Sequence, residues 1–133
     1  MITVDSSVLI PALRQSHPAH EVARAALRQP RLRLLAHVTA ETFAQLTRTR
    51  PRVHPAVVVE ALRALDKKPV ALSGDQYLAT LQSCADGALV GGAVYDALIA
   101  VAARESGLRL LSLDQRAVRT YATMGVDHRL LSV

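Results

Sequence analysis

Asp5 and Asp114 occupy positions where the functional groups of a parallel sheet are usually found. Asp5 directly follows the short, β-branched apolar segment 2–4, and Asp114 directly follows the apolar segment 108–113. If both segments are parallel strands, the two carboxylates lie beyond the carboxyl ends of the strands, at the same edge of the sheet. The simpler alternative is that each Asp only caps the helix that follows it, because Asp is a favoured N-cap residue.

Glu41 and Asp96 are two further candidates. Both are predicted in the first turn of a helix, and the helices of an α/β protein begin near the same edge of the sheet. In that position each could simply oppose the helix dipole. Asp96, however, lies inside the apolar stretch 93–101, where an unpaired charge costs free energy. We therefore expect all four carboxylates to meet in one cleft.

A cleft with four carboxylates needs either protonation or cations. Two carboxylates about 5 Å apart repel each other by roughly 3 kcal/mol at an effective dielectric constant of about 20. Mg²⁺ or Mn²⁺ relieves this repulsion, binds phosphate oxygens and activates water for hydrolysis. We expect Asp5 and Asp96 to bind the metal directly, and Asp114 to bind it directly or through water. Glu41 is expected to hold a metal-bound water or to act as the general base.

The basic composition fits a nucleic-acid substrate. The chain of 133 residues has 16 Lys and Arg against 11 Asp and Glu, a net charge of +5, and every basic residue except Lys67 and Lys68 is Arg. Arg suits phosphate and base edges, although a GC-rich genome would also raise the Arg content. One Phe, three Tyr and no Trp argue against a module that stacks single strands on an aromatic platform. Phosphate contacts are therefore expected to dominate.

Arg48, Arg50 and Arg116 are the candidates for these phosphate contacts. Arg48 shares a helix face with Glu41, because seven residues separate the two positions. Arg50 belongs to the segment 49–54, which is predicted as an exposed basic turn, although an ordinary solvated loop is the favoured interpretation of this segment. Arg116 closely follows the last acidic candidate.

Short apolar segments alternate with longer helical patterns along the whole chain, with no repeat and no linker. This alternation indicates an α/β fold with a short central parallel sheet and helices on both faces, in a single domain over residues 1–133. Thr39 and Ser73 are predicted helix caps. The expected strands are 2–4, 33–36, 70–72, 108–113 and 128–131. The expected helices are 6–14, 18–29, 39–49, 55–65, 73–85, 95–106 and 115–124.

Four stretches of the sequence resemble the PIN-domain family, and within it the VapC-type toxins of type II toxin–antitoxin pairs. These are Thr3-Val4-Asp5-Ser6-Ser7-Val8-Leu9, Thr39-Ala40-Glu41-Thr42, Tyr95-Asp96-Ala97-Leu98-Ile99-Ala100 and Leu110-Leu111-Ser112-Leu113-Asp114. The resemblance spans essentially the whole chain, and it places the acidic quartet of the family on the four carboxylates above. A family hydroxyl falls on Ser112, where Thr is more usual. Many members carry an acid at the position of Arg116, so a second metal is expected to bind weakly or only with substrate.

The resemblance implies a PIN-like three-layer fold and an Mg²⁺- or Mn²⁺-dependent endoribonuclease. It also implies a toxin that a cognate antitoxin neutralises, a homodimer, and a heterotetramer or larger assembly with the antitoxin. We expect Ser6 and Ser112 to orient the carboxylates through hydrogen bonds. For Ser6 the alternative is an early helical position with its hydroxyl in solvent.

Two other classes of protein fit the sequence less well. A receiver-type signalling domain needs a phosphoacceptor Asp after a central strand, but the segment 33–36 leads into His37. It also needs a Lys at the end of a later strand, and the only lysines follow a predicted helix. The second alternative, a PIN-like module that binds nucleic acid or protein without catalysis, is disfavoured by the intact acidic quartet.

Location and partner surfaces are further expectations from the sequence. A single cysteine, Cys84, and the lack of a long apolar run favour a soluble cytoplasmic protein that does not cross a membrane. Apolar faces on the predicted helices 18–29 and 55–65 are candidate surfaces for an antitoxin or a second subunit.

Overall fold

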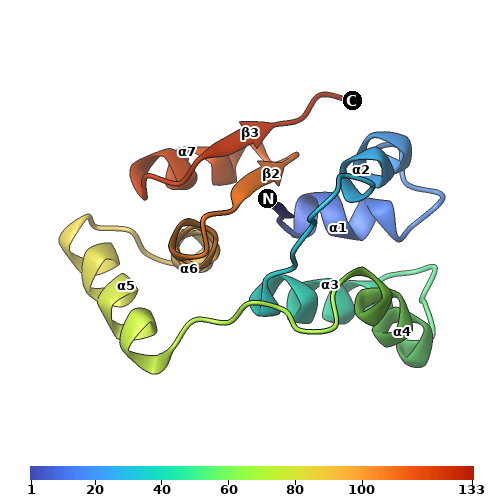
Figure 1. The fold of residues 1–133 in the computed structure, drawn as a ribbon, viewed down its shortest axis with the longest axis horizontal. Helices are drawn as coiled ribbons and strands as arrows, with labels where there is room; N and C mark the ends of the chain where they lie inside the picture. Colours follow the sequence, from blue (N-terminus) through green and yellow to red (C-terminus); the bar gives the residue numbers. More distant parts are fainter.

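The computed structural model describes all residues 1–133 and is an α/β fold, as predicted (Figure 1). Its strands are short, and its helices account for most of the chain. The strands are β1 (Ile2–Val4), β2 (Arg109–Ser112) and β3 (His128–Leu130), and the helices are α1 (Ser6–Ala12), α2 (His20–Leu27), α3 (Ala36–Arg48), α4 (Pro55–Leu65), α5 (Gly74–Asp86), α6 (Gly92–Glu105) and α7 (Gln115–Thr123).

The sheet is parallel, with β2 in the middle and the order β1-β2-β3. The expected strands 33–36 and 70–72 are wrong as regular strands. They are reduced to single parallel bridges, Leu32 with Ile2 and Leu35 with Val70. The first of these segments has no room for a longer strand, because α3 already begins at residue 36.

Helices cover both faces of the sheet and give the expected three layers (Figure 1). On one side α1 packs against β1 and β2 and also contacts α2 and α3. On the other side α6 and α7 pack against β2 and against each other, and α5 contacts α6 further out. None of the helices is long and apolar enough to cross a bilayer.

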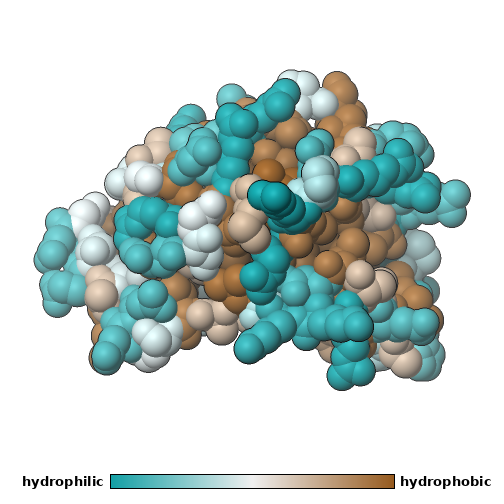
Figure 2. Space-filling view, in the orientation of Figure 1, coloured by the Kyte–Doolittle hydropathy of each residue, from teal (hydrophilic) through white to brown (hydrophobic).

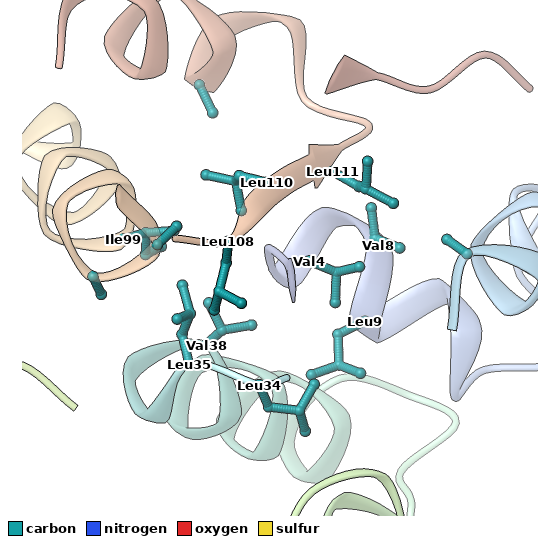
Figure 3. Close-up of a cluster of buried hydrophobic side chains, with 14 of the residues drawn as sticks. Val4, Val8, Leu9, Leu34, Leu35, Val38, Ile99, Leu108, Leu110 and Leu111 are labelled. Carbon is teal, nitrogen blue, oxygen red and sulfur yellow. The ribbon is translucent and has the colours of Figure 1, made fainter. Parts of the chain in front are cut away.

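The core between these layers consists of aliphatic side chains from every layer (Figure 3). Val4 and Leu110 come from the sheet, Leu9 from α1 and Ile99 from α6, and each is at most 2% exposed. In α6 the whole run 97–103 is buried, so this helix passes through the interior. Burial of such apolar surface is the main driving force for folding.

Two helices that carry candidate acids begin earlier than the sequence predicts. The cap at Thr39 is wrong, because α3 already begins at Ala36 and the Thr39 hydroxyl donates to the Ala36 carbonyl at 2.6 Å. The Ala36 N–H donates to the Val70 carbonyl at 2.7 Å, so the sheet edge replaces a capping side chain there. Likewise α6 begins at Gly92 and not at residue 95. The predicted cap at Ser73 is confirmed, with a complete capping box.

Candidate active site

Asp5 lies buried at the carboxyl end of β1, with 3% of its surface exposed. Its Oδ1 accepts the backbone N–H of Ser7 at 3.1 Å and also the Ser7 hydroxyl. Its Oδ2 accepts the hydroxyl of Tyr121 at 2.7 Å. Burial raises the pKa of Asp5, and the hydroxyls of Ser112, Ser7 and Tyr121 oppose that rise. Asp5 therefore does cap α1, as the simpler alternative proposed. Its carboxylate also accepts hydrogen bonds from the hydroxyls of Ser7 and Tyr121.

Ser7, and not Ser6, is the serine that contacts Asp5. The N-cap carboxylate accepts the N–H of the residue two positions later, which brings the Ser7 side chain against it. Ser7 Oγ also accepts the N–H of Leu113 at 2.8 Å and lies 3.3 Å from Ser112 Oγ. Ser112 Oγ in turn accepts the N–H of Asp114 at 3.0 Å. The expectation that Ser6 orients a carboxylate is therefore wrong. Ser7 and Ser112 make these hydrogen bonds, and they connect the end of β1 to the end of β2.

Tyr121 is the largest fully buried side chain of the protein. Burial and the charge of Asp5 raise its pKa, so the phenol stays protonated and donates to Asp5. A buried Tyr hydroxyl needs a hydrogen-bond partner, and here a carboxylate supplies it. The fixed orientation of Asp5 therefore depends on a residue 116 positions later in the chain.

Glu41 approaches from α3 with one oxygen unsatisfied. Its Oε1 is buried and makes no hydrogen bond, and it lies 3.9 Å from Nε2 of His37. Burial and the negative charge of Asp5 raise the pKa of Glu41. A buried carboxylate oxygen without a partner is costly, so this atom is available for a cation, a water or a proton.

Asp96 is influenced by the charges of the other three candidate carboxylates. It lies half-buried in the second turn of α6, and its pKa rises to about 6. Burial is the largest cause, followed by the negative charges of Asp114, Asp5 and Glu41. One carboxyl group therefore senses the other three. The electrostatic coupling places these four carboxylates near one another, from segments that are far apart in the sequence.

Asp114 is exposed and caps α7, with its Oδ1 accepting the N–H of Arg116 at 2.9 Å and that of Ala117 at 3.4 Å. A cavity of about 300 Å³ opens between α6 and α7. Asp96, Asp114 and Arg116 all line it. The cavity therefore has two carboxylates and one guanidinium on its walls, which suits an anionic ligand that also needs a cation.

The helix-dipole alternative is wrong for Glu41 and Asp96. Neither α3 nor α6 has an acidic residue in its first turn, because both helices begin earlier than predicted. The dipole effect falls off within the first turn. Neither carboxylate therefore has a simple structural explanation.

The donor set fits a hard divalent cation in its chemistry. It offers only carboxylate oxygens, which Mg²⁺ and Mn²⁺ prefer, and Glu41 Oε1 lacks any other partner. No three His, Cys, Asp or Glu side chains lie around one point at coordinating distance. A cation bound here would therefore draw carboxylates together or use intervening waters, as Mg²⁺ commonly does.

The three candidate arginines are not gathered in one place. Arg116 lines the acidic cavity. Arg48 is exposed about two turns beyond Glu41 on α3, and its guanidinium donates to Gln45 at 2.7 Å. Arg50 is exposed in the following loop, where Arg14 donates to the backbone carbonyls of residues 49 and 51. Of the three, only Arg116 therefore lines the cavity that contains Asp96 and Asp114.

Sequence reasoning missed four residues of this region: Ser7, Tyr121, His37 and Tyr95. The spacing of Ser7 two positions after a capping Asp is a signal that could have identified it. Nothing local identifies Tyr121, because its contact joins the two ends of the chain. His37 and Tyr95 stack on each other with ring centroids 5.5 Å apart, a contact between helices that only the fold reveals.

Comparison with known proteins identifies the family of this chain. The model of the PIN domain matches residues 2–122, and the chain belongs to the PIN domain family. Among curated proteins of Mycobacterium tuberculosis, it is 36% identical to Ribonuclease VapC40 over 135 residues, covering 99% of this chain and 100% of that one. It is 38% identical to Ribonuclease VapC27 over 128 residues, covering 94% and 93%.

Solved structures with low sequence identity share the fold. The Mycobacterium tuberculosis VapC20 structure, described as a Sarcin-Ricin loop cleaving toxin, superposes with a TM-score of 0.73 at 21% identity, covering 90% of this chain and 94% of that one. VapBC2 from Rickettsia felis, bound to a promoter DNA fragment, gives 0.71 at 12% identity, covering 99% and 100%. The predicted resemblance to the PIN-domain family and to its VapC members is confirmed.

Proposed function

We propose that this protein is a metal-dependent endoribonuclease that acts as the toxin of a toxin–antitoxin pair. The observation that carries the proposal is the Asp96 carboxyl group, which senses Asp114, Asp5 and Glu41 together. The curated relatives at 36% and 38% identity are named ribonucleases, which supports RNA as the substrate. The net charge of +5 supports binding of a polyanion.

Asp5, Asp96 and Asp114 would hold an Mg²⁺ or Mn²⁺ ion, directly or through water. When bound, the ion supplies a Lewis acid for the phosphodiester and lowers the pKa of water. The hydrogen bonds from Ser7 and Tyr121 fix the orientation of Asp5 before the ion arrives. Preorganisation of this kind reduces the cost of assembling the site.

Glu41 would act as the general base. Its raised pKa brings it closer to neutral pH, where proton acceptance is most efficient, and its buried Oε1 has no competing hydrogen bond. Glu41 would take a proton from the attacking water while Arg116 binds the phosphate backbone. Attack by water on phosphorus with departure of the 3′ oxygen would leave a 5′-phosphate on one product.

An antitoxin and a second subunit are proposed as protein partners, in a homodimer and a larger assembly. The solved neighbours include VapBC2 from Rickettsia felis and FitAB, both bound to DNA fragments. The predicted apolar face on α2 is wrong, because none of its large hydrophobic side chains is exposed. On α4, Val57 and Val59 are exposed, which leaves α4 as the candidate partner surface.

The test is cleavage of RNA by purified protein with Mg²⁺, with Mn²⁺ and with EDTA. We expect Asp5→Ala and Asp96→Asn to abolish cleavage while the fold is retained by circular dichroism. Asp75→Asn on exposed α5 is the matched control and should cleave as the unmodified protein does. Cleavage by the Asp96→Asn variant at the normal rate, or undiminished cleavage in EDTA, would refute the proposal. RNA binding without cleavage by the unmodified protein would favour the non-catalytic module.

A further inference from the structure

An aromatic stack lies at the edge of the acidic site. The rings of His37 and Tyr95 are 5.5 Å apart between centroids, with 9° between their planes. His37 belongs to α3 and Tyr95 to α6, so the stack joins the two helices that carry Glu41 and Asp96. These helices are not otherwise closely packed on each other.

Tyr95 is unusual for a residue of α6. The run 97–103 that follows is buried, whereas Tyr95 is 54% exposed. The ring of His37 stacks on the ring of Tyr95. A surface aromatic is common and needs no explanation alone, but here a ring that is stacked on another ring still leaves more than half of the residue's surface open.

The position of the stack restricts what that face can bind. His37 Nε2 lies 3.9 Å from Glu41 Oε1, and Tyr95 directly precedes Asp96 in the sequence. A ligand that brings a phosphate to the carboxylates and a flat apolar group to Tyr95 is a nucleotide within a strand. Each phosphodiester of single-stranded RNA is flanked by two planar bases, and unstacked bases stack readily on aromatic side chains.

We propose that Tyr95, backed by His37, is a stacking subsite for a nucleobase next to the scissile phosphate. The proposal rests on the ribonuclease function and adds a second way of holding the strand. Arg116 contacts the backbone, while the stack holds one base and positions the neighbouring phosphate over the carboxylates. Because every base has a π-face, the subsite tolerates all four bases.

This subsite modifies the expectation, drawn from the few aromatic residues, that RNA is held by phosphate contacts alone. The scarcity of aromatic residues argues against a platform for several successive bases, and the structure has none. One Tyr supported by one His is sufficient for a single base, and His is not counted in aromatic content. The strand is then held at one base and along its backbone.

The experiment uses short single-stranded RNAs with one 2-aminopurine placed at successive positions. The Asp96→Asn variant serves as the background, because it keeps the RNA intact. At one position we expect the 2-aminopurine fluorescence to be quenched on binding. Tyr95→Ala should remove this quenching and weaken binding by about 5- to 150-fold, whereas Tyr95→Phe should retain both. Leu78→Ala, which removes a large side chain that is 69% exposed on α5, is the control and should change neither.

A second RNA, with an abasic nucleotide at that position, separates stacking from a purely structural effect. We expect the abasic RNA to bind the background variant more weakly and to show no further loss with Tyr95→Ala. An equal loss on the intact and abasic RNAs, or unchanged binding by Tyr95→Ala, would overturn the subsite and leave the ribonuclease function standing. Absence of RNA cleavage by the unmodified protein would instead remove the proposed function, and the subsite with it.

Discussion

Asp96→Asn is expected to stabilise the protein in the absence of a divalent cation. The pKa of Asp96 rises from 3.8 to about 6, first through burial and then through the charges of Asp114, Asp5 and Glu41. One pKa unit corresponds to about 1.36 kcal/mol, so ionised Asp96 destabilises the fold by at most about 3 kcal/mol. Asp96 is only half-buried, and screening by solvent reduces this to about 1–2 kcal/mol. The amide carries no charge and removes that cost.

The sign of the pH dependence follows from the same values. The folded state holds the Asp96 proton more tightly than the unfolded chain does, so the cost is fully present above about pH 6. It shrinks as the pH falls from about 6 towards 3.8, and it vanishes below 3.8, where the carboxyl is protonated in both states. The free-energy gain of Asp96→Asn should therefore be largest at neutral pH and vanish in acid.

Urea unfolding in EDTA at pH 7.5 and near pH 4 measures this difference. Glu60→Gln, at an exposed position in the middle of α4 with no ion pair, is the control and should leave the free energy of unfolding nearly unchanged at both pH values. Added Mg²⁺ should stabilise the unmodified protein more than the Asp96→Asn variant, because binding to the folded state raises stability. The reasoning would be refuted if the Asp96→Asn variant were less stable than the unmodified protein in EDTA at pH 7.5. It would also be refuted if the substitution raised the free energy of unfolding equally at both pH values.

Three further predictions concern residues that contact the candidate carboxylates or share a cavity with them. Ser7→Ala should lower the free energy of unfolding by about 1–3 kcal/mol and slow cleavage, because Asp5 and the Leu113 N–H lose a partner, whereas Ser6→Ala should be silent in both assays; equal effects of the two would contradict the assignment. Tyr121→Phe should destabilise by about 1–3 kcal/mol for the same reason and weaken Mn²⁺ binding measured by calorimetry, and unchanged Mn²⁺ affinity would show that the hydroxyl is not needed. Arg116→Ala should weaken RNA binding and reduce the slope of its salt dependence by about 1; an unchanged slope would remove Arg116 from the contacts.

Much of the fold is predictable because its signals are local. Helix α4 has the predicted bounds, since Pro55 favours its first turn and the apolar periodicity continues to Leu65. The start of α3 was not predictable, because the Ala36 N–H is satisfied by the Val70 carbonyl and no capping side chain marks the position. The segments 33–36 and 70–72 form no regular strands, because they pair through the single bridge between Leu35 and Val70 and not through a continuous ladder of hydrogen bonds.

The candidate site, like the fold, was predictable only where its signals are local in the sequence. The acids were identifiable because Asp5 follows a strand directly and Asp96 interrupts an apolar helix. Their surroundings were not, because the contacts of Tyr121 with Asp5 and of Tyr95 with His37 join segments that are far apart in the sequence. On the face drawn in Figure 2, hydrophilic and hydrophobic residues lie side by side.

The hydrogen bond between Tyr121 and Asp5 relates the order of synthesis to the completeness of the site. Asp5 is translated before Asp114 and before Tyr121, which follows it by 116 positions. A nascent chain therefore lacks the hydroxyl that holds Asp5 until Tyr121 has left the ribosome. For a protein proposed to cut RNA, this order would keep the site incomplete until that point of its own translation.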